Sequence, residues 1–161
     1  IAAYPPAEVV EHLLALPRAA TAGVRWTPPE QWHVTLRFFG ACELPELEQS
    51  FAGLVASPGT ARSGRVGRLG RDALVVPITG LDELASAVRA ATADIGRPPD
   101  HDRFLGHLTL ARLRGAPACG LIGEAVDVMW EVDEIALVES VLDPAGARHT
   151  VVARRRLGVS S

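Results

Sequence analysis

The chain has 161 residues, of which 48% are apolar and 22% are charged, and its formal net charge is −3. This composition excludes a largely disordered chain, and no apolar run approaches the roughly 20 residues needed to span a bilayer. All 16 basic residues are arginines, which excludes mechanisms that need a lysine, and the net negative charge means that an anionic partner must be bound locally.

In the first part of the chain, a helix is expected after Pro5-Pro6, where apolar residues recur at helical spacing until Pro17. Residues 33–39 alternate and predict a strand that ends at Gly40. Alternation places Val34, Leu36 and Phe38 on one face of this strand, and His33, Thr35, Arg37 and Phe39 on the other. A second helix is expected over about 44–56.

The second part of the chain predicts further strands and one helix. Residues 65–69 and 73–78 flank a Gly70-Arg71-Asp72 turn and predict a hairpin. Helical spacing over 81–95 is followed by Gly96, and strands are expected over 106–113, 126–130, 134–142 and 150–157, with a turn at 143–146. Because strand pairs follow one another and only some are separated by helices, this order predicts an α+β fold.

One short motif occurs twice. His33-Val34-Thr35-Leu36 returns as His107-Leu108-Thr109-Leu110, and each copy lies in an expected strand. A strand places the His and the Thr of each copy on the same face, with their Cβ atoms about 7 Å apart. Two such copies related by a pseudo-twofold axis would direct two imidazoles and two hydroxyls at one small group.

This constellation suits in-line displacement at phosphorus. One neutral histidine can take a proton from an attacking water, and the other, protonated, can give one to the departing oxygen. Threonine hydroxyls and an arginine can hydrogen-bond the non-bridging oxygens in the transition state. Arg37 and Arg112 follow the two motifs and are the candidate arginines. No metal or cofactor is needed for this chemistry, and the two cysteines, Cys42 and Cys119, have no metal-binding spacing.

The two motif regions, 24–40 and 103–112, and the ending at 138–146 resemble the 2H phosphoesterases, named for their two His-x-Thr motifs. Within that superfamily the chain is most similar to the RNA 2′,3′-cyclic phosphodiesterases, also called 2′-5′ RNA ligase-like proteins. The resemblance implies two pseudo-symmetric lobes, each an antiparallel sheet with outer helices, facing across a central cleft in one bilobal domain over 1–161. Gln31 stands where the family usually has an asparagine.

The resemblance also implies an activity and its residues. The family hydrolyses 2′,3′-cyclic phosphates to 2′-phosphomonoesters, and some members join or split 2′-5′ linkages. By this resemblance His33 protonates the leaving 3′ oxygen, His107 activates water, and Thr35, Thr109 and Arg112 bind the phosphate. Strict alternation puts Arg112 on the opposite face from His107, so the strand either ends or bulges near Ala111, or Arg112 reaches around its edge.

Three other interpretations stay open. The same site could act on a small cyclic phosphate or a 2′-5′ oligoadenylate, or the chain could be a non-catalytic module that binds RNA ends. Phe38 and Phe39 could include a ring that stacks on a base, or both could lie in the core. The expected partner is an RNA or oligonucleotide with a 2′,3′-cyclic phosphate end. We further expect a cytoplasmic monomer with no signal peptide, no membrane contact and no metal.

Overall fold

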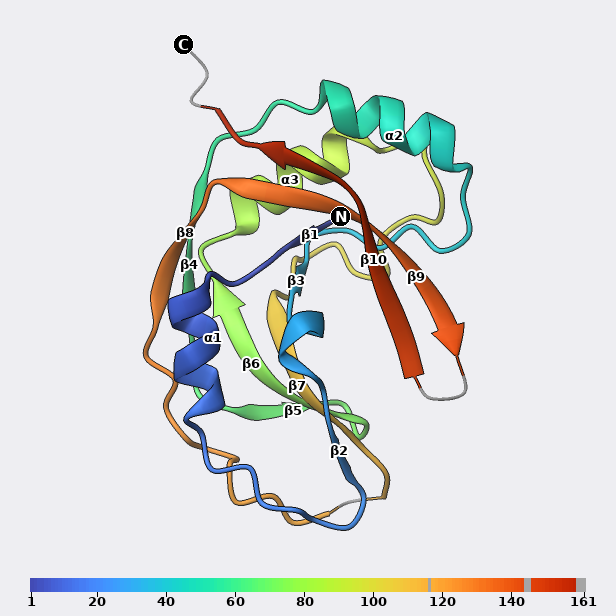
Figure 1. Ribbon diagram of the computed structural model, residues 1–161. Helices are drawn as coiled ribbons and strands as arrows, with labels where there is room; N and C mark the ends of the chain where they lie inside the picture. Colours follow the sequence, from blue (N-terminus) through green and yellow to red (C-terminus); the bar gives the residue numbers. More distant parts are fainter. Residues whose placement is uncertain (116, 144–145, 159–161) are drawn as a thin grey trace.

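Figure 1 shows the computed structural model of the chain, in which residues 1–115, 117–143 and 146–158 are described. Three α-helices and one 3₁₀-helix occur in this part of the chain: α1 (Ala7–Leu14), η1 (Pro29–Gln31), α2 (Leu44–Gly53) and α3 (Asp82–Ala91). The strands are β1 (Ala2–Ala3), β2 (Val24–Trp26), β3 (Val34–Thr35), β4 (Gly59–Ser63), β5 (Gly67–Leu69), β6 (Ala73–Thr79), β7 (His107–Leu113), β8 (Met129–Val132), β9 (Glu134–Asp143) and β10 (Gly146–Arg156).

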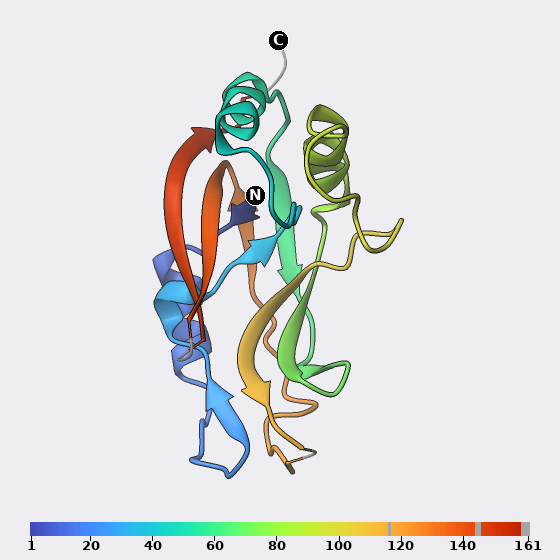
Figure 2. The same cartoon turned by 90° about the vertical axis from the view of Figure 1, so that its right-hand side faces the viewer.

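The strands form a sheet in the order β10-β9-β1-β3-β7-β6-β4-β8, with β2 paired to β7 and β5 paired to β6. Each of these pairs is antiparallel. The sheet is curled, so that β9 and β10 face β6 and β7, and α2 and α3 lie together at one end of the molecule (Figures 1 and 2). The α+β fold with two facing halves is therefore confirmed.

Among the described residues, a single pair joins the two halves of the strand order, which are β10-β9-β1-β3 and β7-β6-β4-β8. Val34 of β3 lies opposite Leu108 of β7, and both side chains are fully buried. These are the middle residues of the two repeated motifs. The halves therefore meet at the two motifs.

The core is continuous beneath both halves and explains why the helices form where the sequence predicts them. Val9 and Leu13 of α1, Leu47 and Phe51 of α2, and Leu84, Ala85 and Val88 of α3 are buried at helical spacing. Acidic residues in the first turn of α3 suit the positive end of its dipole. Helix α1 ends at Leu14, three residues before Pro17.

The strand expected over 33–39 is shorter than the sequence predicts. Strand β3 ends at Thr35, and the amides of Leu36 and Arg37 both donate to the carbonyl of Ile1. Two residues opposite one partner leave an extra residue on this side, as in a β-bulge, and reverse the faces that follow. Arg37 is consequently buried, and Phe38 is 58% exposed while Phe39 is buried, which is the opposite of the expected alternation.

Other differences concern short or distant strands. The sequence does not predict β1, β2 or most of β4, which have two, three and five residues. Strand β8 begins at Met129 rather than Val126, and β10 begins at Gly146 rather than Thr150. The expected turn at 143–146 includes residues 144–145, which lie outside the described residues. In the described part of the chain, no helix combines the length and the apolar character of a membrane span.

Candidate active site

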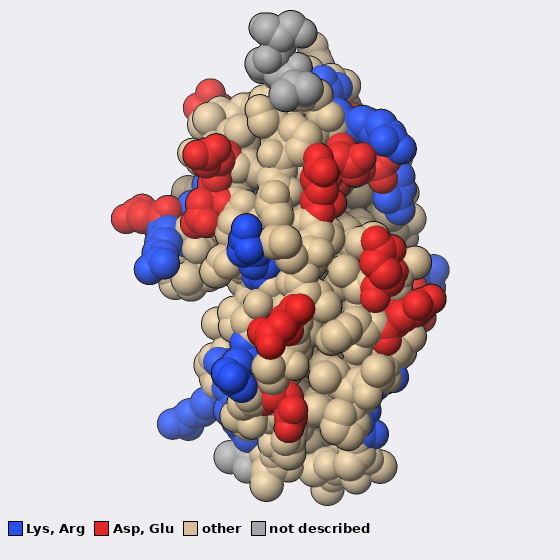
Figure 3. Space-filling view, turned by 90° about the vertical axis from the view of Figure 1, so that its left-hand side faces the viewer, with Lys and Arg blue, Asp and Glu red and all other residues tan. Residues whose placement is uncertain are grey.

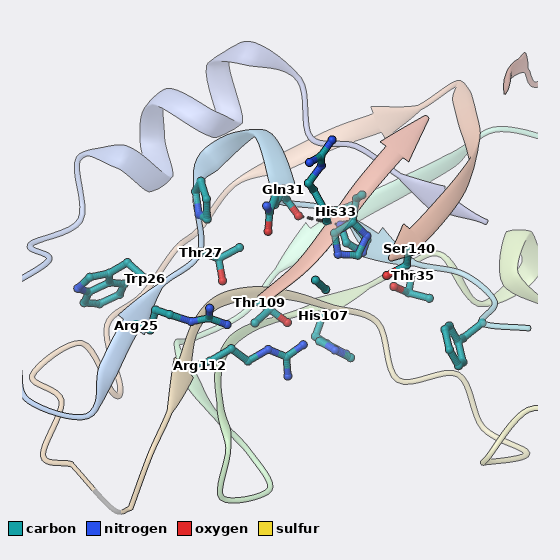
Figure 4. A pocket seen from close by; sticks show the side chains of 15 residues that line it. Arg25, Trp26, Thr27, Gln31, His33, Thr35, His107, Thr109, Arg112 and Ser140 are labelled. Carbon is teal, nitrogen blue, oxygen red and sulfur yellow. Dashed lines mark hydrogen bonds between the residues drawn. The ribbon is translucent and has the colours of Figure 1, made fainter. Parts of the chain in front are cut away.

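The register between β3 and β7 brings the four predicted motif side chains together. Because Val34 lies opposite Leu108 in an antiparallel pair, His33 lies beside Thr109, and Thr35 lies beside His107. Val34 and Leu108 point into the core, so the side chains on either side of them point out of it. Figure 4 shows these four residues around one cavity.

The cavity, which we call the cleft, has a volume of about 540 Å³. Both halves of the sheet and the segment before β3 contribute side chains to it. Its lining residues are Arg25, Trp26, Thr27, Pro28, Gln31, His33, Thr35, Phe38, His107, Thr109, Arg112, Ser140, Ala147, Arg148 and His149.

The two motif histidines make the same hydrogen bond. His33 Nδ1 lies 2.7 Å from the carbonyl oxygen of Gln31, and His107 Nδ1 lies 2.8 Å from that of Leu105. A carbonyl oxygen only accepts, so Nδ1 must carry the proton in both rings. Each ring is therefore held by the carbonyl two residues earlier, and Nε2 remains for proton transfer.

A bulge in β7 settles the position of Arg112. Val75 of β6 lies opposite Thr109, but Leu74 lies opposite Ala111, so Leu110 is an extra residue on β7. Leu110 and Ala111 are both buried, and Arg112 then lines the cleft. Of the alternatives that the sequence left open, the bulge near Ala111 is the one that the structure contains.

Arg25 is a cleft residue that sequence reasoning missed. Strand β2 pairs with the end of β7, and Arg25 lies directly opposite Arg112. Like charges opposite one another in a sheet are destabilising, and an anion between them removes that cost. Val24-Arg25-Trp26 has the alternation of a strand but is too short to predict one.

Comparison with known proteins agrees with this geometry. The family model described as "LigT like Phosphoesterase" matches residues 4–67, which include His33 and Thr35. The structure of TT0787 from Thermus thermophilus resembles the chain with a TM-score of 0.77 and 26% identity, over 97% of this chain and 95% of that one. The chain is thus similar to the LigT-like phosphoesterases, over residues 4–67 in sequence and over 97% of its length in fold. The predicted resemblance to the 2H phosphoesterases is thereby confirmed.

The fold is shared with further LigT-like phosphoesterases. E. coli LigT in complex with 3′-AMP has a TM-score of 0.74 and 24% identity, over 97% of this chain and 95% of that one. Other structures of E. coli LigT contain phosphate, NADP+ or ATP, with TM-scores of 0.70, 0.68 and 0.66, each at 24–26% identity over 97% of this chain and 94–95% of that one. The comparison with curated proteins gives no match.

The residue that corresponds to Arg112 after the first motif is Phe38, not Arg37. Phe38 and Arg112 each stand five residues after a motif histidine, and each follows two buried residues. Both line the cleft. The pseudo-symmetry therefore places an aromatic ring at one position and a guanidinium group at its equivalent.

Arg37 does not lie in the cleft, and its predicted place beside His33 is wrong. Its guanidinium group donates to the carbonyls of Arg89 and Ile95, at 3.0 and 2.9 Å. The extra residue after Thr35 turns this side chain toward α3 and the loop that follows it. Arg37 therefore ties that loop to the sheet.

His149 and Ser140 are two further cleft residues without an assigned role in the sequence prediction. They lie directly opposite one another on β10 and β9. The ring centroid of His149 is 4.8 Å from that of His33, and Tyr4 lies 5.9 Å from His33. The hairpin of β9 and β10 thus covers His33.

Burial makes His33 a weak base in the free protein. Desolvation, opposed in part by the hydrogen bond to Gln31 and reinforced by His149 and His107, lowers the pKa of His33 to about 4. Burial and the nearby Arg112 also lower the pKa of His149. His33 is therefore neutral at pH 7 in the free protein.

The cleft is cationic although the chain is not. Arg25, Arg112 and Arg148 line it, and its described lining includes no Asp or Glu. Acidic side chains are instead spread over the face shown in Figure 3. Among the described residues, no group of three or more His, Cys, Asp or Glu could hold a metal ion. The cleft therefore suits an anion without an acidic metal site.

Proposed function

We propose that this protein hydrolyses RNA 2′,3′-cyclic phosphate ends to 2′-phosphomonoesters. The observation that carries the proposal is the matched pair of histidines, each with Nδ1–H bound to a carbonyl and Nε2 left for the cleft. Two such groups are what displacement at a phosphodiester requires, one to accept a proton and one to donate it. Binding alone would need neither.

In the proposed reaction, water attacks phosphorus and gives a proton to Nε2 of His107. The bond from phosphorus to the ribose 3′ oxygen breaks, and protonated His33 gives its Nε2 proton to that oxygen. The product keeps the 2′ ester and gains a free 3′ hydroxyl. Proton exchange with solvent returns both rings to their starting states.

The acid role of His33 depends on the substrate. Because the pKa of His33 is about 4 in the free protein, the ring must gain its proton with the bound phosphate. A phosphodiester anion beside an imidazole raises its pKa, and Arg112 holds that anion in the cleft. Thr35 and Thr109 are positioned to donate to the non-bridging oxygens.

The ligands of the relatives support the phosphate and nucleotide parts of the proposal. E. coli LigT is described in complex with phosphate and with 3′-AMP, a nucleotide with a phosphate on its ribose. The same cleft geometry would allow a 5′ hydroxyl to replace water, which would form a 2′-5′ linkage.

The test is incubation of the purified protein with a short RNA that ends in a 2′,3′-cyclic phosphate, once with EDTA and once without it. A 2′-phosphate product, absent in His33→Asn and His107→Asn, is the expected result. Turnover of a small cyclic phosphate but not of RNA would keep the mechanism and replace RNA by a small cyclic phosphate as the proposed substrate. No turnover of either would favour an RNA-end binding module, and loss of turnover in EDTA would contradict the metal-independent mechanism.

A further inference from the structure

The cleft continues past His107 into a second pocket of about 300 Å³. Thr35, Phe38 and His107 line both cavities. The rest of the second pocket comes mainly from residues 97–105, in the segment between α3 and β7, and from Leu69 of β5. A substrate that reaches His107 therefore has room to extend beyond it.

The second pocket has an exposed apolar wall. Phe38 is 58% exposed, Leu105 is 50% exposed and Leu69 is 42% exposed, although all three are large apolar side chains. The guanidinium carbon of Arg97 lies 5.9 Å from the centroid of the Phe38 ring. An exposed ring beside a cation is the usual platform for an unpaired nucleic-acid base.

Four arginines and one acid, Asp100, line the second pocket, but the arginines are not equivalent. Arg37 and Arg89 donate to backbone carbonyls. Arg97 makes an exposed two-pronged ion pair with Asp100, at 2.7 and 2.8 Å, and Arg103 has no hydrogen bond or ion pair within the described chain. Exposed ion pairs contribute little stability, so Arg97 and Arg103 can both turn to a phosphate.

We propose that the second pocket binds the nucleotide that precedes the cyclic-phosphate nucleotide in an RNA strand. Its base packs against Phe38, and its phosphodiester lies near Arg97 and Arg103. This inference rests on the proposed function, because it takes the reacting phosphate to lie between His33 and His107. It makes the preferred substrate an oligonucleotide of two or more residues, rather than a mononucleotide or another small cyclic phosphate.

The first test compares kcat/KM for a nucleoside 2′,3′-cyclic phosphate and for a dinucleotide with the same end. The wild-type protein should favour the dinucleotide by about tenfold or more, and Phe38→Ala should lower that ratio by about tenfold, since the stacked base is lost. Phe38→Trp should preserve the ratio. Equal values for the two substrates in the wild-type protein, or an equal loss on both in Phe38→Ala, would overturn the proposal.

The second test addresses the phosphate. Arg97→Gln combined with Arg103→Gln should lower the same ratio and make the dinucleotide reaction less sensitive to salt, because fewer cations contact the strand. The matched control is Arg156→Gln, which removes an exposed ion pair with Asp133, at 3.3 Å, on another part of the surface. A control that changes the ratio as much as the double variant would contradict a local phosphate contact.

A binding measurement separates this inference from the proposed function. If the protein hydrolyses neither substrate, the proposed function fails, but affinities can still be measured for a dinucleotide and a mononucleotide that end in a 2′-phosphate. Tighter binding of the dinucleotide that Phe38→Ala abolishes would support the second pocket. Equal affinity for the two ligands would overturn it.

Discussion

His33 and His107 are held by equivalent hydrogen bonds, each from Nδ1–H to the carbonyl oxygen two residues earlier in the chain. The equivalence extends to the two buried residues that follow the threonine of each motif, and to the cleft residue after them, which is Phe38 in one case and Arg112 in the other. The environments of the rings nevertheless differ, because His33 lies against His149 and Tyr4. The two rings are therefore held by the same kind of hydrogen bond but lie in different electrostatic surroundings.

Each motif histidine should be essential. His33→Asn and His107→Asn keep a side-chain N–H near the position of Nδ1 and remove Nε2, so the tether to the carbonyl survives while proton transfer does not. Each variant should lower kcat by about 10²- to 10⁴-fold, measured by product release from a cyclic-phosphate RNA. His12→Asn, on the exposed face of α1, is the control. Near-normal kcat in either motif variant would refute the two-histidine mechanism.

Changing the leaving group of the substrate should distinguish the role of His33 from that of His107. In a substrate whose leaving 3′ oxygen is replaced by sulfur, the departing thiolate needs no proton, because a thiol is far more acidic than a hydroxyl. His33→Asn should then recover much of the wild-type rate, and His107→Asn should not. Rescue of His107→Asn alone would exchange the two roles, and rescue of both variants would contradict general acid catalysis by either.

Arg112 and Arg37 should have opposite effects on activity and stability. Arg112→Gln should lower kcat/KM by about 10²- to 10³-fold, the usual cost of losing one donor to transition-state charge. It should not reduce the free energy of unfolding, because the Arg112 side chain makes no hydrogen bond or ion pair within the described part of the chain. Arg37→Met should instead lower that free energy by about 2–5 kcal/mol, since two buried carbonyls lose their donor. Urea unfolding and steady-state kinetics on both variants test the contrast.

Acid should destabilise the protein through His33. The pKa of His33 is about 4 in the folded chain and 6.5 in the unfolded chain, so between these pH values the unfolded chain binds more protons and stability decreases as the pH is lowered. At pH 4.5 the loss from this group is about 2–3 kcal/mol relative to pH 7. Urea unfolding at both pH values should show a smaller difference in His33→Asn. An equal difference in the variant would place the acid sensitivity elsewhere.

The meeting of the two motifs at one site could be predicted from the sequence because the motif repeats, and the chemistry of that site stays a prediction. Two His-x-Thr tetrads on expected strands are a local pattern, and a local pattern can be recognised without knowledge of the fold. The family comparison and the shared cleft agree with that prediction.

The residues around the motifs depend on single-residue irregularities that local sequence does not reveal. One extra residue after Thr35 places Phe38 in the cleft instead of Arg37. One extra residue at Leu110 places Arg112 in the cleft. A shift of one residue moves every later side chain to the other face of a strand. Arg25 comes from a three-residue strand that pairs with the distant β7, so its place in the cleft needed the three-dimensional pairing. Ser140 and His149 pair within one hairpin, but only the pairing of β9 with the distant β1 joins that hairpin to the rest of the sheet.

The pairing of Val34 with Leu108 ties catalysis to the completion of folding. The two histidines lie 74 residues apart in sequence, and the contact between their neighbours closes the loop between the two halves. A chain cut at the exposed turn of Gly70, Arg71 and Asp72 would leave one motif histidine on each fragment. By the proposed mechanism, neither fragment could hydrolyse a phosphodiester by itself, and turnover after mixing would report directly that the fragments had reassembled.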